Sequence, residues 1–211
     1  MLFRSKQILG CSEFQRLHRI HQLSCEYLVF PTATHTRFSH SIGTYHVMKN
    51  LIAHFTLELK KLGYEVKEED KNLAYIAALL HDVGHGAFSH TFEKIFGVKS
   101  HEQWTKEIIS DKDTSLHKKI VELYGEEFIK RLISIISKSY KDDEKSKIFD
   151  IIATLVSSQT DADRMDYLLR DSYFTSVTNG RYDIQRLIKS FGVKETVGRS
   201  EERRVGKECR S

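Results

Sequence analysis

The stretch LAYIAALLHDVGHG (residues 73–86) places an uninterrupted apolar run directly before a His-Asp pair. The run Leu73–Leu80 carries no charge and two glycines follow it, which predicts a buried helix that ends near Asp82. At a helix end, neighbouring residues that differ by about 100° around the axis can still turn toward one ion. His81 and Asp82 are therefore candidate metal ligands.

The rest of the chain favours an all-α fold. Proline occurs once and glycines are sparse, as expected for a mostly helical chain. The stretch SFGVKETVG (190–198) alternates like the start of a β-strand, so we expect at most a minor β element there. Apolar residues recur at helical spacing in further segments, which we expect to be helices: Phe14–Leu23, Phe38–Leu62, Trp104–Ile109, Leu116–Leu123, Phe128–Ile136, Ile148–Val156 and Met165–Leu169.

Two further side chains complete the candidate metal site. His40 lies in RFSHS (37–41), and Asp163 lies in DADRMDYLLRD (161–171). Together with the His-Asp pair they offer two imidazoles and two carboxylates from separate helical segments. Such a set suits a divalent cation such as Mn, Mg, Fe, Co or Zn, with positions left open for water and a phosphate. The alternative for His40 alone is a buried, hydrogen-bonded core histidine, and the set as a whole favours a ligand.

Four spaced motifs occur in one order along the chain: TRFSHS (36–41), HDVGHGAFSH (81–90), HEQ (101–103) and DADRMDYLLRD (161–171). Together they resemble the HD superfamily of metal-dependent phosphohydrolases, and most closely its deoxynucleoside triphosphate triphosphohydrolase branch. EFQRLHRIHQL (13–23) extends the similarity, which covers most of residues 13–190. The resemblance implies an HD-domain helical fold and hydrolysis of deoxynucleoside triphosphates (dNTPs) to a deoxynucleoside and inorganic triphosphate.

Arginines flank the predicted metal site. Arg37 lies three residues before His40, so on a helix the two side chains share a face. A guanidinium fork there would neutralise a phosphate by binding two of its oxygens. The alternative for Arg37 is a surface salt bridge. Arg164 matches a basic residue that lies on the phosphate side in the family.

Histidines follow the metal pair closely. Hydrolysis of a phosphate ester needs a proton for the leaving oxygen, and histidine supplies one most readily near neutral pH. The resemblance implies that His90 is this acid and that His85 contacts a phosphate. It also implies that His101 and Glu102 orient the catalytic histidine.

Asp163, Tyr167 and Asp171 are spaced by four residues and share one helical stripe. Tyr167 and Asp171 then lie about 6 and 12 Å from Asp163 along the axis, within reach of a nucleoside sugar. The resemblance implies that Tyr167 packs on the sugar and that Asp171 binds its 3′-hydroxyl. It also implies that Gln22 and Leu23 face the nucleobase and sugar. The alternatives are a core tyrosine and a salt-bridged or capping aspartate.

The last 13 residues, RSEERRVGKECRS (199–211), resemble the translation of a widely used DNA sequencing adapter. We expect residues 1–198 to be one HD phosphohydrolase domain cut short at its C-terminus, and residues 199–211 to be non-native. The tail holds five of the 33 basic and three of the 29 acidic residues, which leaves 28 and 26, a net charge of +2. This balance argues against a nucleic-acid partner.

We expect the protein to lie in the reducing cytoplasm. Cys11 and Cys25 lack CxxC spacing, and no signal-type apolar segment opens the chain. The run Leu73–Leu80 is too short to span a bilayer, so we expect no membrane association.

Two other functions stay open. One is an HD phosphodiesterase or phosphohydrolase for another nucleotide, although no GYP signature follows the His-Asp pair. The other is an inactive truncated fragment or a nucleotide-binding module. The resemblance further implies a homo-oligomer, a dimer or a tetramer, with a nucleotide activator. Gly10, Gln15 and His18 occupy the effector positions and depart from the pattern of guanine-activated relatives, so the need for an activator stays open.

Overall fold

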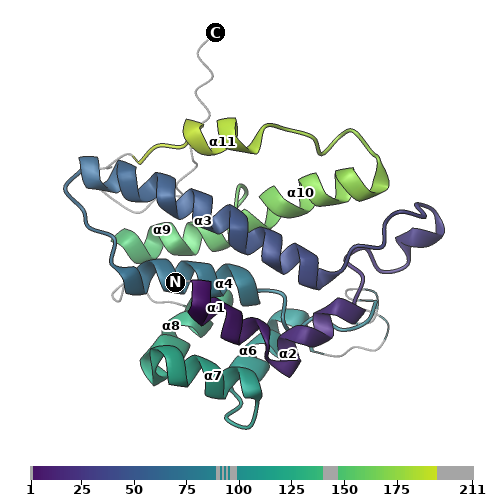
Figure 1. Cartoon of the computed structure of the whole chain (residues 1–211), viewed down its shortest axis with the longest axis horizontal. Helices are drawn as coiled ribbons and strands as arrows, with labels where there is room; N and C mark the ends of the chain where they lie inside the picture. Colours follow the sequence, from purple (N-terminus) through teal and green to yellow (C-terminus); the bar gives the residue numbers. More distant parts are fainter. Residues whose placement is uncertain are drawn as a thin grey trace.

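The computed structural model describes residues 2–88, 91, 93, 95, 99–139 and 147–193, with side chains from residue 6 onward. Among these residues there is no β-strand, only an isolated bridge between His21 and Thr36, so the predicted all-α fold is confirmed. The helices, shown in Figure 1, are α1 (Leu2–Leu9), α2 (Ser12–Gln15), η1 (Arg16–Arg19), η2 (Glu26–Leu28), α3 (Arg37–Lys61), α4 (Glu68–Leu80), α6 (His101–Ser110), α7 (Ser115–Tyr124), α8 (Glu126–Ile136), α9 (Lys147–Val156), α10 (Ala162–Thr175) and α11 (Ile184–Ser190).

Helix α4 forms the centre of the fold. Its first turn is acidic, which suits the positive end of a helix dipole, and every residue of its apolar run Leu73–Leu80 is buried. It packs against α3, α8 and α9, which surround it on several sides. A helix that is apolar on all faces is stable only when neighbours cover all of them. This burial explains why the run lacks the amphipathic pattern of a surface helix.

Helices α3 and α10 pack closely on each other, next to α4. Both begin with a capping side chain: Thr36 accepts a hydrogen bond from the backbone of Ser39, and Asp161 accepts one from Arg164. These caps fix where each helix starts. His40 and Asp163 therefore lie in the first turns of their helices, close to the point where α4 ends.

Helices α6, α7 and α8 form the lower layer of Figure 1, with α1 and α2 packed against α7. Helix α6 lies directly against the turn that follows α4. A Cβ atom on Gly84 would lie 2.2 Å from both the carbonyl oxygen of His101 and the backbone nitrogen of Thr105. Only glycine permits this approach, which brings His101 next to the His-Asp pair.

The helix expected over Phe14–Leu23 ends early, in the 3₁₀ turn η1. At Ile20 and His21 the chain is extended instead, because its backbone pairs with the residues that lead into α3. The carbonyl of Ile20 accepts the N–H of Arg37 at 2.9 Å, and the N–H of Gln22 donates to the carbonyl of His35 at 3.0 Å. These long-range bonds replace the helical ones that the periodicity predicted.

The two ends of the described chain also differ from the expectation. Helices α1 and α11 were not predicted, and α11 begins where Asp183 caps its first turn. Of the expected β element at 190–198, residues 191–193 have no regular structure and residues 194–198 lie outside the described part. The expected domain boundary at residue 198 lies there too.

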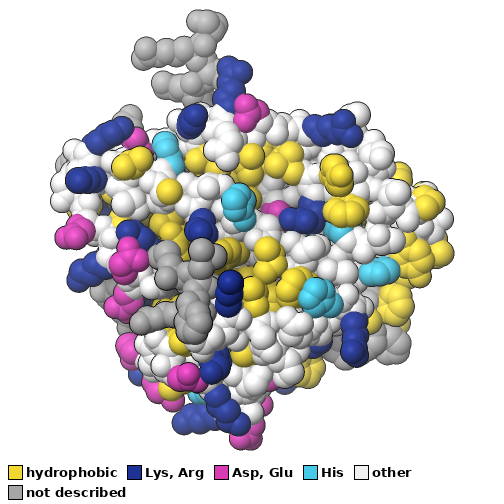
Figure 2. Space-filling view, in the orientation of Figure 1, with side chains coloured by type: hydrophobic (Ala, Val, Ile, Leu, Met, Phe, Trp, Pro, Cys, Tyr) yellow, Lys and Arg dark blue, Asp and Glu magenta, His cyan; other side chains and the backbone are white. Residues whose placement is uncertain are grey.

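The surface mixes charge of both signs with one exposed apolar segment. In Figure 2 basic and acidic side chains are interspersed over the face shown, and hydrophobic side chains gather at its right edge. Leu28, the last residue of η2, and the adjacent Val29 are 73% and 74% exposed. Cys11 is buried, Cys25 is exposed, and both are free thiols. Within the described residues, every helix is too short or too polar to cross a membrane.

Candidate metal centre

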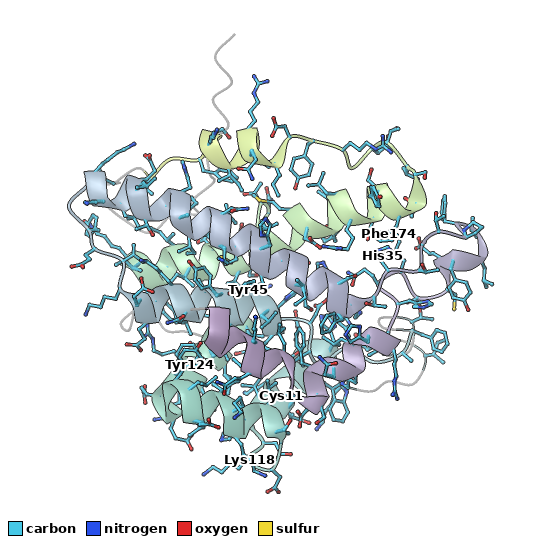
Figure 3. All side chains as sticks on the ribbon, viewed as in Figure 1. Cys11, His35, Tyr45, Lys118, Tyr124 and Phe174 are labelled. Carbon is cyan, nitrogen blue, oxygen red and sulfur yellow. The ribbon has the colours of Figure 1, made fainter. Side chains whose placement is uncertain are left out.

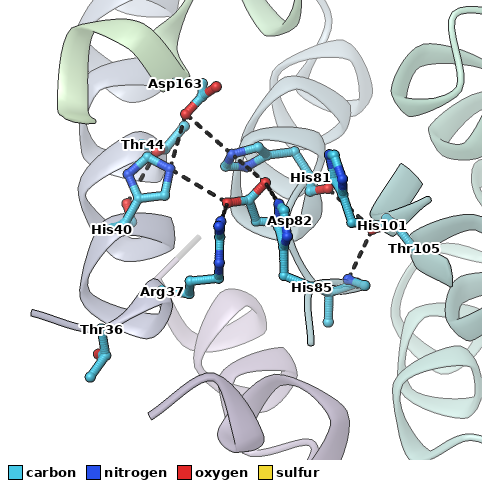
Figure 4. Close-up of polar contacts among 12 residues, drawn as sticks. Thr36, Arg37, His40, Thr44, His81, Asp82, His85, His101, Thr105 and Asp163 are labelled. Atoms are coloured by element: carbon cyan, nitrogen blue, oxygen red, sulfur yellow. Dashed lines mark hydrogen bonds and ion pairs between the residues drawn. The ribbon is translucent and has the colours of Figure 1, made fainter. Parts of the chain in front are cut away.

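The side chains of His40, His81, Asp82 and Asp163 meet where the start of α3, the end of α4 and the start of α10 come together (Figure 4). Nε2 of His40 lies 3.0 Å from Oδ1 of Asp163 and 3.8 Å from Oδ2 of Asp82. Nε2 of His81 lies 3.5 Å from the same oxygen of Asp163 and 3.3 Å from Oδ1 of Asp82. The four side chains that the sequence singled out therefore converge on one point.

In their neutral form, the two histidines present the lone pair of Nε2 to this point. Nδ1 of His40 donates to the carboxylate of Asp166 at 2.8 Å, and Nδ1 of His81 donates to the carbonyl of Ala78 at 2.9 Å. Because each acceptor takes a proton from Nδ1, the lone pair of each neutral ring lies on Nε2. Both Nε2 atoms are buried, and neither has a hydrogen-bond partner in the described part of the chain. Two orphaned lone pairs facing two carboxylates fit a bound cation.

The charges of the four side chains also favour a bound cation. Burial lowers the pKa of His81, but the carboxylates of Asp82 and Asp163 outweigh it and raise this pKa to about 10. Burial raises the pKa of Asp163, but His40 and His81 outweigh it and hold that pKa below its ordinary value. The centre thus carries a concentrated negative potential that only a proton or a cation can balance.

Arg37 occupies the first position of α3, one helical turn from His40, and is 5% exposed. Its guanidinium forms an ion pair with Oδ2 of Asp82. Burial raises the pKa of Asp82, but His81, His85 and Arg37 lower it well below the usual range. Arg37 is therefore a buried cation at the edge of the metal centre and not the surface salt bridge that was the alternative.

A second group of side chains lies on the far side of Asp82. Nε2 of His85 is 3.3 Å from Oδ1 of Asp82, and its ring stacks on that of His101 at 3.9 Å. Burial lowers the pKa of His85 to about 4 and outweighs the opposing effect of Asp82, so the ring is neutral at physiological pH. Thr105 supports the turn, because its hydroxyl accepts the backbone N–H of Gly84 at 2.9 Å.

Glu93 holds His101, a contact that the sequence did not reveal. Its Oε1 lies 3.1 Å from Nδ1 of His101 and accepts the backbone N–H of the same residue at 3.0 Å. Glu102, the predicted partner, is exposed on α6. The predicted acid His90 lies outside the described residues. The only sequence signal for Glu93 is its place three residues after His90, which on a helix puts both on one face.

The predicted stripe lies on α10, which contains Asp163, Tyr167 and Asp171. Tyr167 is half-buried, and burial raises its pKa. Oδ1 of Asp171 lies 2.7 Å from Nε2 of His35, a residue that the sequence did not single out. The stripe thus runs along α10 from the metal centre to Asp171, whose carboxylate is hydrogen-bonded by His35 from the segment before α3.

The remaining predicted substrate contacts are placed as follows. Gln22 and Leu23 are half-buried in the segment that pairs with the start of α3, so Gln22 lies close to His35. Arg164 is exposed on α10, directly after Asp163. The structure brings Gln22 toward the Asp171 end of the stripe and Arg164 toward its Asp163 end.

Comparison with known proteins agrees with this arrangement. The profile of the HD domain matches residues 37–171, which hold all four candidate ligands. The chain is 39% identical over 188 residues to the uncharacterized protein YwfO of Bacillus subtilis, covering 89% of this chain and 40% of that protein. It is 34% identical over 187 residues to a protein of Dictyostelium discoideum named deoxynucleoside triphosphate triphosphohydrolase SAMHD1 homolog, covering 86% of this chain and 35% of the other.

A solved structure is similar to this chain in fold as well as in sequence. It is described as a phosphohydrolase from Bacteroides thetaiotaomicron and superposes with a TM-score of 0.72 at 33% identity, covering 90% of this chain and 43% of that one. The chain thus spans less than half the length of each of these three proteins. Because the profile covers more than half of its residues and includes the converging His and Asp side chains, this chain belongs to the HD-domain family.

Proposed function

We propose that this protein is a metal-dependent phosphohydrolase that converts dNTPs to the deoxynucleoside and inorganic triphosphate. The observation that carries the proposal is the convergence of His40, His81, Asp82 and Asp163. Two of their buried Nε2 atoms have no hydrogen-bond partner among the residues that the structure describes. Similarity to proteins named as deoxynucleoside triphosphate triphosphohydrolases supports the choice of substrate.

His40, His81, Asp82 and Asp163 hold the cation in this proposal. Nitrogen and oxygen ligands suit Mn, Mg, Fe, Co or Zn, so the donor set alone does not select one metal. A bound divalent cation supplies a Lewis acid that polarises a phosphate oxygen and lowers the pKa of water.

The neighbouring side chains bind the phosphate group and protonate the oxygen of the leaving nucleoside. Arg37 is a buried cation beside Asp82 and offsets the negative charge of the α-phosphate. His85 is neutral, so its imidazole can hydrogen-bond a phosphate oxygen without adding charge. His90 protonates the 5′-oxygen of the leaving nucleoside, and the His101–Glu93 pair lies beside the turn that leads to it. The family resemblance gives Glu102, with His101, the role of orienting the catalytic histidine, and Glu93 holds His101 in place.

The α10 stripe binds the sugar. With phosphates at Asp163, Tyr167 and Asp171 follow about 6 and 12 Å along the helix axis. Tyr167 closes the space near the 2′ carbon, which excludes ribonucleotides, and Asp171 accepts the 3′-hydroxyl. Gln22 and Leu23 line the side of the nucleobase and sugar, and Arg164 lies on the phosphate side.

The test measures metal content and triphosphate release together. Wild-type protein is incubated with Mn or Mg and each dNTP or ribonucleotide, and triphosphate is detected by chromatography. Asp163→Ala should lose bound metal and turnover, whereas Asp113→Ala, an exposed aspartate between α6 and α7, should keep both. Unchanged metal content and turnover in Asp163→Ala would overturn the proposal, and release of a single phosphate would favour another phosphohydrolase activity.

Assembly and activation form a separate part of the proposal. We expect a homo-oligomer, a dimer or a tetramer, and a nucleotide that activates it. Mass photometry with and without each dNTP and GTP tests this directly. A monomer whose turnover does not respond to any added nucleotide would contradict both expectations.

A further inference from the structure

His35 lies in the extended segment two residues before α3, and its side chain is fully buried. Its Nε2 is 2.7 Å from Oδ1 of Asp171, which lies on α10 far away in the sequence. Its ring stacks on Phe174 with centroids 4.6 Å apart and planes 20° apart. Figure 3 labels both residues beside α10. The ring therefore packs against the last turns of α10, close to the start of α3.

The direction of the hydrogen bond between His35 and Asp171 follows from the chemistry of the two groups. An ionised carboxylate only accepts, so the proton lies on Nε2 of His35 and is donated to Asp171. Nδ1 of His35 is buried and has no hydrogen-bond partner among the described residues. Asp171 is the single polar anchor of the ring there, so His35 does not belong to a wider network that would explain its position.

Asp171 keeps a free side. Its side chain is 24% exposed, and within the described chain His35 is its one side-chain hydrogen-bond partner. One carboxylate oxygen is thus held while the other stays available to a hydroxyl group from outside. A carboxylate fixed in this way offers a directed acceptor, because it does not have to lose rotational freedom when the ligand arrives.

His35 also holds the segment opposite Asp171. Its carbonyl accepts the backbone N–H of Gln22 at 3.0 Å. Oε1 of Gln22 is buried and has no hydrogen-bond partner in the described part of the chain. His35 therefore contacts both the side chain of Asp171 and the backbone of Gln22, two residues that the proposed function assigns to the sugar and base.

We propose that His35 is a positioning residue that orients Asp171 toward the 3′-hydroxyl of the substrate and thereby sets selectivity for sugars that carry this hydroxyl. The inference rests on the proposed function. A site that hydrogen-bonds a substrate hydroxyl rejects an analogue without it, because the polar groups of the site are then left unpaired. Loosening Asp171 weakens that rejection without changing the metal centre.

The test compares each dNTP with its 2′,3′-dideoxy counterpart. His35→Ala should lower the preference for the 3′-hydroxyl about tenfold, the equivalent of one hydrogen bond. The change should arise from a higher KM for the dNTP, with kcat and the KM of the dideoxy compound nearly unchanged. His35→Gln keeps a donor and should restore part of the preference. His54→Ala is the matched control, because His54 is a half-buried histidine whose Nε2 lies 2.8 Å from the carbonyl oxygen of Phe191, away from α10.

Binding provides a readout that is independent of turnover. The dissociation constants of an α,β-imido dNTP and of its 3′-deoxy form should converge in His35→Ala. Asp171→Ala by itself removes the acceptor and should abolish the preference, and adding His35→Ala to it should change nothing further. The inference would be overturned if His35→Ala weakened the binding of both nucleotides equally, or if the effects of the two substitutions were additive. His35 would then have a structural role only. If wild-type protein binds dNTPs selectively but releases no triphosphate, the proposed function fails while the inference on His35 is still decided.

Discussion

The carboxylate of Asp166 joins His40 to Arg170. Its Oδ2 accepts the Nδ1 proton of His40 at 2.8 Å, and both oxygens accept from the guanidinium of Arg170, at 2.7 and 2.8 Å. Burial raises the pKa of Asp166, but the hydrogen bonds of His40 and Arg170 outweigh it and lower this pKa, so the group is ionised. An ionised partner fixes the tautomer of a metal-binding histidine and increases its basicity.

Asp166→Asn should therefore weaken metal binding while the fold is kept. The amide can still accept the proton of His40, but it lacks the charge that makes the imidazole a strong ligand. Loss of such an outer carboxylate lowers metal affinity by about 10- to 100-fold. Titration of metal-free protein with Mn²⁺ by calorimetry measures the effect, and Asp113→Asn on the surface is the control. An unchanged affinity in Asp166→Asn would show that the contact serves folding alone.

Gly43→Ala should destabilise the protein although alanine favours helices. A Cβ atom at this position in α3 would lie 1.9 Å from Oδ1 of Asp166 and 2.1 Å from Nη2 of Arg170. The ion pair must move, and overpacking of this kind costs about 1–3 kcal/mol, more than the gain of about 1 kcal/mol in helix propensity. Urea unfolding measures the difference. Gly10→Ala is the control, since its Cβ would meet nothing closer than the carbonyl of Gln7 at 3.5 Å.

The helical core could be predicted because its signals are local. The run Leu73–Leu80 is apolar on all faces and is buried as a helix. Helices α3 and α7 also begin and end within one residue of the ranges Phe38–Leu62 and Leu116–Leu123 that the sequence predicted. The segment after η1 could not be predicted in this way. Its helical periodicity is overridden by backbone bonds to residues 35–37, which lie 13 to 17 positions further along the chain.

The residues of the candidate site also differ in whether the sequence alone could identify them. Residue type and motif order were enough to single out His40, His81, Asp82 and Asp163, which the fold brings together. Glu93 and His35 carry no such mark. Their importance depends on which side chain they contact, and those contacts with His101 and Asp171 exist only once α6 and α10 are packed.

Arg16 should stabilise the turn that carries His85. Its guanidinium is half-buried and donates to the carbonyl of His85 at 2.7 Å and to the carbonyl of Val83. Arg16→Met leaves both carbonyls without this donor, and an unpaired buried polar group costs about 1–3 kcal/mol. We expect this loss in the free energy of unfolding and faster amide exchange over residues 81–88. Arg19→Met, which alters an exposed residue of the same turn, should change neither quantity.

The contact between Glu13 and Ser115 should make stability depend on pH in the acid range. Glu13 accepts the backbone N–H of Ser115 at 2.8 Å and the hydroxyl of the same residue, which ties α2 to α7. Partial burial raises the pKa of Glu13, but the bonds from Ser115 outweigh it and lower this pKa. A carboxyl whose folded pKa lies below the unfolded value of about 4.3 stabilises the fold above that pH and loses this effect as the pH falls through the folded pKa.

Glu13→Gln removes the titrating group and keeps the shape of the side chain. The wild-type protein should exceed the variant in free energy of unfolding at neutral pH, and the difference should shrink as the solution is acidified below the ordinary pKa of a glutamate. Urea unfolding across this range measures both curves. In a Ser115→Ala background the difference should be small at every pH, because the bonds that lower the pKa are gone. A difference that stays constant on acidification would mean that Glu13 acts through packing and not through its charge.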